Sequence, residues 1–369
     1  MSRKKIITSA FSNLYTDQRI EKVCQTLYTD GYQIELIGND WGGAEPMERP
    51  YPFYRIHLKS KSLKTAYFEF NWKLYQILKR KADKDTILHA NDIDAILPNY
   101  LISKQLNIPL VFDSHEIFTE LPSVQGKISQ KIWRILERRT VPNLRFMMAA
   151  SQSYADWFEK HYGVKPVVVR NIPRRIETVP TITENHPKVV LYQGVINMSR
   201  GIDKAILAMK FLEDTELVIA GDGPMRKTYE HLVRENHLEE KVKFLGKLKP
   251  ENLRKVTKKA DVGLSIEENG GVSYLYSLPN KVSDYIQARV PIVMINFPEM
   301  MRVKSQFEVG EVITDHQPET IAKAIRKVLE KGRKNYLPEL EKASKALCWE
   351  NEETKILHLF SRAENSDSF

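Results

Sequence analysis

The chain has 369 residues, 42% of them apolar, and this length exceeds what one hydrophobic core usually serves, so we expect two domains. A formal charge of +9 and a sequence pI of about 9.2 suit a phosphorylated small molecule, an anionic membrane surface or nucleic acid. The two cysteines, Cys24 and Cys348, stand far apart without a CxxC pattern, which argues against a disulfide framework or a zinc site and indicates a cytoplasmic protein.

The sequence also limits contact with membranes. It begins MSRKKIITSAF, whose apolar run is too short for a signal peptide and is typical of a first strand. No stretch approaches the roughly 18 apolar residues of a membrane span. Any membrane contact is therefore expected to be peripheral, at the inner face of the membrane.

The first half of the chain alternates short β-rich runs with helical patterns. Strands are expected in KKIITSAF, YQIELIG, DTILHA, IPLVFDS and RFMMAAS. Helices are expected in DQRIEKVCQTLYTDG, DIDAILPNYLISKQLN, residues 125–141 and QSYADWFEKHYG. This alternation predicts a Rossmann-like domain with a parallel sheet over residues 1–172.

The pattern breaks in NIPRRIETVPTITENHP, so residues 173–186 are expected to link two domains. It restarts at KVVLYQG and continues through VPIVMIN, which predicts a second Rossmann-like domain over residues 187–345. Residues 346–369 are expected to form a C-terminal helix that packs back on the first domain. The predicted fold class is α/β, with two facing doubly wound domains and ligands in the cleft between them.

The stretch YQGVINMSRGID places Gly194 at a strand end and Arg200 with Gly201 at the start of the next helix. Glycine lets the backbone approach a ligand closely, and a helix N-terminus beside a guanidinium suits a phosphate. An ordinary loop with an exposed arginine explains the stretch equally well. Both interpretations stay open from the residues alone.

The stretch YSLPNKVSDYIQARVPIV predicts a helix that begins at Leu278 and Pro279 and is followed by a strand. Free amides near Asn280 and the Lys281 ammonium offer a diphosphate both hydrogen bonds and opposite charge. Asp284 lies about one turn deeper, where it can accept hydrogen bonds from sugar hydroxyls. An acid that merely complements the helix dipole is the alternative, but three polar residues on one face favour a site.

In the first domain, His115 and Glu116 follow the strand IPLVFDS at its carboxyl end, where ligand-binding residues of such sheets lie. A structural and a functional histidine are equally compatible with this position. Asp92 ends the preceding strand and is also suited to cap the next helix. Asp92 and Asp94 spell a DxD pattern, but both fall in a helix's first turn without a third ligand, so no metal site is predicted.

Residues 59–81 mix basic and aromatic residues with a single acid. That composition suits a helix lying at an anionic membrane interface. A helix that buries its aromatic side on the sheet and leaves a basic face in water is the favoured alternative. Nucleic acid is not expected, because no recognised binding motif accompanies the charge.

Together these segments resemble retaining glycosyltransferases of the GT-B fold, in the family 4 group that uses nucleotide-sugar donors, over nearly the whole chain. TDQRIEKVCQTLYTDGYQIELIG is similar to the family's D-x-R-V-x-K-x-A helix and second strand. ILHANDIDAILPNYLISKQLNIPLVFDSHEIFTELP resembles its H-A-H-D and Y-D-S-H-E region, and SLPNKVSDYIQARVPIV resembles its S-L-P-N-K-x-x-E-Y-I motif. The resemblance implies transfer of a sugar in glycan, polysaccharide or glycolipid biosynthesis.

The resemblance also implies roles for individual residues. His115 would lie near the transferred sugar, and Arg200 and Lys281 would be catalytic cations at the donor diphosphate. The implied donor-binding residues are Gly194, Arg200, Leu248, Asn280, Lys281 and Asp284. Leu248 would flank the base through its backbone, and Asp284 would hold the ribose. The implied acceptor-side residues are Asp17, Arg19, Asp92 and Glu116. Family members work without a metal, so no cofactor is implied.

Some positions depart from the family pattern. Tyr276 stands where many relatives have an acid, eight positions before the second one, and Glu267 or Glu268 is the substitute that the loop offers. Val195 replaces a frequent arginine, so the diphosphate charge is expected to fall more heavily on the two remaining cations. Arg289 replaces a preferred glycine, and FSNLYTD replaces the glycine-rich acceptor loop, so the acceptor side transfers poorly.

The predicted function is therefore retaining transfer of a hexosyl unit to a glycan, a lipid-linked saccharide or a small molecule. Two alternatives stay open: a nucleotide-sugar epimerase of the same fold, and a non-catalytic nucleotide-sugar-binding protein. The missing acid and arginine motivate the second alternative. A nicotinamide dehydrogenase is not expected, because neither domain has a GxGxxG after its first strand.

Overall fold

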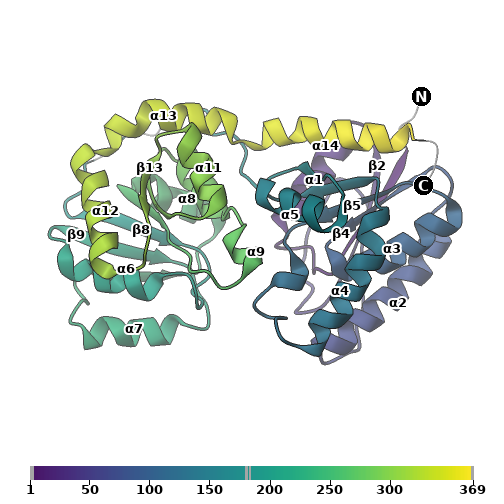
Figure 1. The fold of residues 1–369 in the computed structure, drawn as a ribbon, viewed down its shortest axis with the longest axis horizontal. Helices are drawn as coiled ribbons and strands as arrows, with labels where there is room; N and C mark the ends of the chain where they lie inside the picture. Colours follow the sequence, from purple (N-terminus) through teal and green to yellow (C-terminus); the bar gives the residue numbers. More distant parts are fainter. Residues whose placement is uncertain (1–3, 179–181, 183, 367–369) are drawn as a thin grey trace. The chain divides into compact units, whose positions relative to one another are not determined.

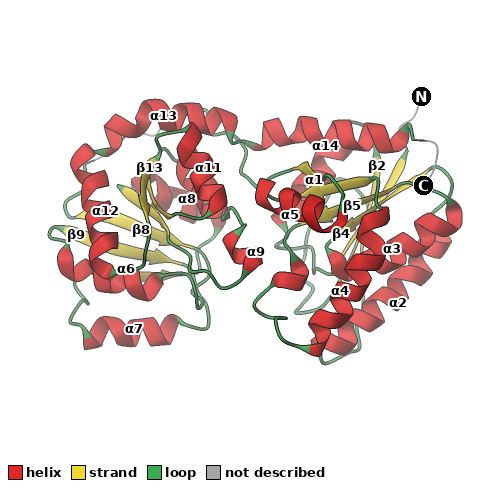
Figure 2. Ribbon diagram, viewed as in Figure 1, coloured by secondary structure: helices red, strands yellow, loops and turns green. Residues whose placement is uncertain are grey.

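The computed structural model describes residues 4–178, 182 and 184–366. The chain divides into two compact units, one of Met1–Asn171 with Glu352–Phe369 and the other of Ile172–Asn351. Of the expected linker 173–186, residues 179–181 and 183 lie outside the described residues. Each unit is an α/β layer structure in which helices cover a parallel sheet (Figure 2), as the alternating pattern predicts.

The N-terminal unit holds a seven-stranded parallel sheet in the order β3-β2-β1-β4-β5-β6-β7 (Figure 1). Its strands are β1 (Lys5–Ala10), β2 (Gln33–Asn39), β3 (Phe53–Ile56), β4 (Thr86–Asn91), β5 (Leu110–Ser114), β6 (Phe146–Ala149) and β7 (Val167–Val168). Its helices are α1 (Gln18–Thr29), α2 (Leu63–Lys81), α3 (Ile93–Leu106), α4 (Ile128–Thr140) and α5 (Gln152–Tyr162), with 3₁₀ turns η1 (Phe118–Glu120) and η2 (Val141–Asn143).

The C-terminal unit holds a six-stranded parallel sheet in the order β10-β9-β8-β11-β12-β13. Its strands are β8 (Lys188–Gln193), β9 (Thr215–Ala220), β10 (Val242–Gly246), β11 (Val262–Ser265), β12 (Ile292–Ile295) and β13 (Gly310–Ile313). Its helices are α6 (Ile202–Ala208), α7 (Arg226–Glu235), α8 (Pro250–Lys259), α9 (Val272–Leu275), α10 (Asn280–Gln287), α11 (Pro298–Gln306), α12 (Pro318–Lys331) and α13 (Arg333–Ala346), with the 3₁₀ turn η3 (Met209–Phe211).

Both sheets have a topological switch point, where strand order reverses beside the first strand of the unit. The switch lies between β1 and β4 in one sheet and between β8 and β11 in the other. Ligands of doubly wound sheets bind at such points, outside the carboxyl ends of the strands. The residues that follow β4, β5, β8 and β11 are therefore the first candidates for a site.

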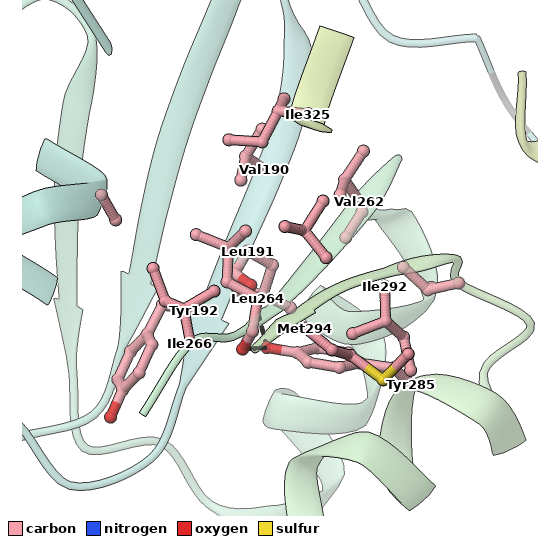
Figure 3. Close-up of a cluster of buried hydrophobic side chains, with 14 of the residues drawn as sticks. Val190, Leu191, Tyr192, Val262, Leu264, Ile266, Tyr285, Ile292, Met294 and Ile325 are labelled. Atoms are coloured by element: carbon pink, nitrogen blue, oxygen red, sulfur yellow. Dashed lines mark hydrogen bonds between the residues drawn. The ribbon is translucent and has the colours of Figure 1, made fainter. Parts of the chain in front are cut away.

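A tyrosine anchors α10 to the C-terminal sheet (Figure 3). The phenol of Tyr285 donates to the Leu191 carbonyl at 2.8 Å and accepts from the Gln193 N–H at 3.2 Å. Gly263 makes room for the ring, because a Cβ there would lie 2.5 Å from the Tyr285 Cδ2 atom. The ring is fully buried among apolar strand residues. These contacts fix the start of α10 relative to the end of β8.

The C-terminal helix α14 (Trp349–Glu364) packs on the N-terminal unit, as predicted. Its buried Glu352 accepts a hydrogen bond from the Arg170 N–H at 3.1 Å. Near its end, Phe360 makes an edge contact with His89, and Glu364 accepts from the Tyr32 phenol at 3.1 Å. Among the described residues, no helix is long and apolar enough to cross a bilayer.

Some elements differ from the expected ones. The helix expected from Leu278 begins at Asn280, because Pro279 is extended with a ψ of 135°. The helix expected from residue 125 begins at Ile128, after Gly126 turns the chain with a φ of +72°. Strands β3 and β13 are absent from the expected set, since each has only four residues at a sheet edge and lacks a clear alternating pattern.

Candidate active site

His115 lies at the switch point of the N-terminal sheet, directly after β5. Its main-chain N–H donates to Asp92 Oδ1 at 2.8 Å, and its ring Nδ1 lies 3.3 Å from Asp92 Oδ2. On the other side of the ring, Nε2 lies 3.2 Å from Asn91 Oδ1 and 3.5 Å from Asp113 Oδ2. The imidazole is thus held between two carboxylates, with 19% of the side chain exposed.

Behind this histidine, Asp113 and Arg19 form a buried two-pronged ion pair. Arg19 Nε donates to Asp113 Oδ2 at 2.9 Å and Nη2 donates to Oδ1 at 2.6 Å. The remaining Nη1 donates to the Val169 carbonyl at 2.6 Å. Arg19 is 3% exposed and Asp113 is fully buried. The contacts of Arg19 therefore support the position of His115 from within the core.

The charges of this cluster keep His115 protonated. Burial disfavours the imidazolium, but the carboxylates of Asp92 and Asp113 outweigh it and raise the pKa of His115 to about 9. Burial likewise disfavours the Asp113 carboxylate, yet Arg19 and His115 hold its pKa well below the usual range. At neutral pH His115 is a cation that donates hydrogen bonds and has no free nitrogen to accept a proton.

Asp92 does not cap α3. Its φ of +57° is unusual for a residue other than glycine, and its side chain makes no capping hydrogen bond to α3. The carboxylate faces His115 instead. Functional sites often contain a strained residue at a strand end whose side chain forms hydrogen bonds with a neighbouring loop.

Two further acids lie near Asp92. Burial, together with the Asp92 carboxylate, raises the pKa of Glu116 to about 7 and raises the pKa of Asp94 well above its usual range. Asp17 has a different place: its carboxylate caps α1 by accepting from the Ile20 N–H at 3.2 Å. Among the described residues, no group of three or more His, Cys, Asp or Glu side chains is placed to hold a metal ion.

Lys281 lies at the switch point of the C-terminal sheet. Its Nζ donates to Glu267 Oε1 at 2.8 Å and lies 4.0 Å from the centre of the Tyr192 ring. A Cβ built on Gly194, which follows β8 with a φ of +135°, would lie 3.8 Å from the same Nζ. Lys281 is 9% exposed. The first turn of α10 thus delivers an ammonium to the glycine turn after β8.

Glu267 is the acid that the sequence left unplaced, and the structure puts it beside Lys281. It is 1% exposed, and its second carboxylate oxygen accepts from the Ser265 hydroxyl at 2.8 Å. Burial opposes its charge, but Lys281 and Ser265 outweigh this and lower the pKa of Glu267. Lys281 is therefore held in one position by a charged, hydrogen-bonded partner.

Arg200 lies beside the loop that follows β11 and contains Glu267 and Glu268. The segment around it packs closely there, since the Glu268 N–H donates to the Ser199 carbonyl at 3.0 Å and a Cβ on Gly201 would lie 2.3 Å from the Ile266 carbonyl oxygen. The guanidinium lies 4.9 Å from the centre of the Tyr274 ring. Within the described part of the chain, no carboxylate lies within ion-pair distance of Arg200. It is a cation available to a ligand.

The other predicted donor residues lie around this turn in different states. Asn280 is exposed at the first position of α10. Asp284 is half-buried and accepts from the Gln193 Nε2 amide at 3.0 Å, while the Thr257 hydroxyl donates to the other end of that amide at 2.7 Å. Leu248 packs partly buried against the core after β10. Their roles toward a nucleotide stay predictions.

The structure adds Asn91, Asp113 and Tyr192, which the sequence patterns do not single out, and it gives a partner to Glu267, one of the two acids that the loop offers. Asp113 and Asn91 hold His115, and Tyr192 and Glu267 hold Lys281. The available signal for Asp113 is a charged residue inside an otherwise apolar strand. The signal for Glu267 is an acid two residues after the end of β11, at a switch point that the sheet order reveals.

Comparison with known proteins shows which protein families each half of the chain resembles. Residues 18–179 match Glycosyltransferase Family 4, and residues 175–346 match Glycosyl transferases group 1. The chain therefore matches two glycosyltransferase family models in succession, which together span residues 18–346.

Individual relatives are more distant. An uncharacterized glycosyltransferase of Methanocaldococcus jannaschii, MJ1607, is 30% identical over 151 residues, and the match covers 40% of this chain and 37% of that protein. Sucrose-phosphate synthase from Thermosynechococcus elongatus has a similar structure, with a TM-score of 0.80 at 15% identity over 98% of this chain and 99% of that one. HepE of Anabaena, solved in complex with UDP, has a TM-score of 0.75 at 15% identity, and the match covers 97% of this chain and 99% of that one. These solved structures confirm the GT-B fold.

Proposed function

We propose that the chain transfers a glycosyl unit from a nucleotide diphosphate sugar to an acceptor hydroxyl, with retention at the anomeric carbon. The observation that carries this proposal is the cationic turn after β8, where Lys281 meets Gly194 and the loop that holds Arg200. Two cations beside the free amides of a helix N-terminus suit a diphosphate. HepE, a solved neighbour with UDP-glucose bound, supports the same class of donor.

The reaction breaks the bond between the anomeric carbon and the diphosphate oxygen, and the electron pair of that bond goes to the oxygen. Negative charge therefore grows on the leaving diphosphate, where Lys281 and Arg200 stabilise it. The acceptor oxygen bonds to the anomeric carbon on the same face, and its proton passes to the departing phosphate oxygen. The carboxylates of Asp92, Asp113 and Glu267 are bound to cations, which favours this path over attack by one of these three carboxylates.

His115 is proposed to orient the transferred sugar as a cationic hydrogen-bond donor. Its pKa of about 9 makes it unsuited to deprotonate the acceptor at neutral pH. Asp92 and Glu116, which lie near its ring, are proposed to contact the acceptor side. Full activity in the presence of a metal chelator is expected, because Lys281 and Arg200 supply the positive charge; loss of activity that magnesium restores would contradict this.

The direct test is an assay with defined substrates. Thermal-shift screening against a panel of nucleotide sugars identifies the donor, because a ligand that binds only the folded chain raises its Tm. The donor is then incubated with candidate glycan, lipid-linked and small-molecule acceptors, and the anomeric configuration of the product is read by NMR. Inversion of configuration would refute retention, and turnover of the donor to an epimer without acceptor would refute transfer.

The cellular setting follows as a further part of the proposal. We propose a cytoplasmic enzyme of glycan, polysaccharide or glycolipid biosynthesis. WaaG, a glycosyltransferase involved in lipopolysaccharide biosynthesis, has a similar structure, with a TM-score of 0.69 at 17% identity over 96% of this chain and 99% of that one. The predicted membrane contact of residues 59–81 is supported by two aromatic side chains of α2 that stay in solvent, Phe68 at 79% and Trp72 at 60% exposure.

A further inference from the structure

Helix α4 lies on the N-terminal unit with its apolar side outward. Ile128, Ile132 and Ile135 recur at helical spacing on one face and are 78%, 60% and 57% exposed. Surface helices of globular proteins usually turn such a stripe toward the core. The isoleucine face of α4 is thus turned to solvent, whereas Trp133 and Leu136 are half-buried.

Polar contacts explain how this orientation is held. Gln130 and Glu137 are buried on the inner side of α4. Gln130 Nε2 donates to the Thr119 carbonyl at 2.7 Å, and Glu137 accepts from the Thr119 hydroxyl at 3.1 Å and from the Tyr162 phenol at 2.7 Å. These satisfied hydrogen bonds fix which face of the helix turns inward. The isoleucines therefore remain outside in a well-defined array.

Helices α2 and α4 both pack against α3 in the N-terminal unit (Figure 1). The rings of Tyr67 on α2 and Trp133 on α4 meet edge to face, with centroids 5.3 Å apart. One residue further along α2, Phe68 is exposed, and Trp72 follows one turn later. Two neighbouring helices thus expose large apolar side chains.

The exposed charges along α4 are positive. Lys127, Lys131, Arg138 and Arg139 are exposed, and the single acid of the helix, Glu137, is buried. An exposed apolar stripe between basic residues is complementary to a surface that is apolar inside and anionic outside. A protein partner would need a matching acidic rim, whereas an anionic bilayer supplies both properties at once.

We propose that the face of α4 formed by Ile128, Ile132 and Ile135, with its flanking lysines and arginines, docks on an anionic lipid bilayer. The three isoleucines enter the boundary between headgroups and acyl chains, and the basic residues contact the lipid phosphates. This docking is independent of the sugar chemistry, so its test uses no donor or acceptor.

The test is co-sedimentation of the full chain with vesicles of phosphatidylcholine alone or mixed with phosphatidylglycerol. The wild-type chain is expected to bind only the anionic vesicles, and high salt is expected to release it. The double variant Ile132→Ser with Ile135→Ser should weaken binding by about tenfold or more, because apolar contact with the acyl region is lost. The triple variant Lys131→Gln, Arg138→Gln and Arg139→Gln should weaken it on the order of a hundredfold.

Matched controls separate docking from general effects of charge and surface. The triple variant Lys227→Gln, Arg254→Gln and Lys255→Gln removes the same charge from exposed positions of the C-terminal unit and should bind like wild type. Met301→Ser, at 40% exposure on α11, controls for loss of an exposed apolar side chain. Unchanged melting temperatures show that the variants fold.

Three outcomes would overturn the proposal. The first is absence of wild-type binding to anionic vesicles, and the second is equal binding to neutral and anionic vesicles. The third is a dimer, detected by light scattering, that the isoleucine variant abolishes while vesicle binding is unaffected; the face would then belong to a second copy of the chain.

Discussion

The two candidate clusters both combine buried cations with carboxylates, but they differ in how their charges are balanced. In the N-terminal unit, Arg19 is paired with Asp113, and His115 lies between Asp113 and Asp92. In the C-terminal unit, Lys281 is paired with Glu267. No carboxylate of the described residues lies within ion-pair distance of Arg200. The first cluster neutralises itself and suits an uncharged sugar. The second retains positive charge, which suits a phosphorylated ligand.

The largest effect is expected from breaking the buried pair behind His115. Asp113→Asn leaves the Arg19 guanidinium buried without its counter-charge, which costs about 3–5 kcal/mol of unfolding free energy. Urea denaturation measures this loss. The double variant Asp113→Asn with Arg19→Met should recover much of it, because no unpaired charge remains. A single variant as stable as wild type would mean that the pair does not hold the cluster.

Removing the ammonium of the second cluster should damage turnover most. Lys281→Met is expected to lower kcat by roughly 10²–10³, the range for loss of one group that stabilises developing charge. It also leaves Glu267 buried and unpaired, so stability falls as well. Adding Glu267→Gln should restore the melting temperature without restoring kcat, which separates the two roles.

Lys327→Met is the matched control for that substitution, since Lys327 pairs with Glu311 on the surface of the same unit at 2.8 Å. It should leave kcat unchanged. Recovery of turnover in the Lys281→Met, Glu267→Gln double variant would show that the ammonium acts only through folding.

Arg200 tests the uncompensated charge directly. Arg200→Ala should lower kcat/KM by about 10- to 100-fold, because a charge-assisted contact with the diphosphate is lost. It should leave the melting temperature close to that of wild type, since within the described ranges the guanidinium contacts the Tyr274 ring and forms no ion pair. Steady-state kinetics and calorimetry measure the two effects. Unchanged kinetics would remove Arg200 from the donor site.

The smallest effect concerns pH. The folded pKa of His115, about 9, lies above its ordinary value of 6.5, so its contribution to stability is complete below pH 6.5 and is lost as pH rises through 9. The rise in pKa sets an upper limit of about 3 kcal/mol on this loss, and the partial exposure of the ring reduces it. Unfolding free energies of wild type and His115→Asn, compared across this range, isolate the contribution. Parallel curves for the two proteins would contradict the raised pKa.

The alternation of strands and helices could be predicted because apolar periodicity is local in the sequence, and both parallel sheets confirm it. The positions of His115 and Lys281 at strand and helix ends could be inferred from motifs. The pairs that hold them could not, because Asp113 and Arg19 are 94 residues apart and Glu267 precedes Lys281 by 14. Such pairs depend on the strand order, which no local pattern contains.

Helix α4 shows a second limit of local patterns. Its spacing of isoleucines predicts a helix correctly but would place the wrong face inward. The outcome depends on hydrogen bonds with residues outside the helix: Gln130 donates to the Thr119 carbonyl, and Glu137 accepts from the Thr119 hydroxyl and the Tyr162 phenol. Periodicity therefore identifies the helix, and partners distant along the chain decide its orientation.

The anchoring of α10 by Tyr285 separates a part of the chain whose position is fixed, the start of α10, from a part that can vary, the segment before it. The Tyr285 phenol forms hydrogen bonds with the backbone of β8. The sheet therefore determines the position of Lys281, and the loop that precedes α10 does not. Tyr274 lies in α9, and Tyr276 follows α9 in that loop. If the proposed function is correct, changes there would alter the surroundings of the donor while the ammonium stays in place, so donor preference could diverge without loss of the proposed phosphate contact. Gly263 is the opposite case, since even one added methyl group would press on the ring that fixes the helix.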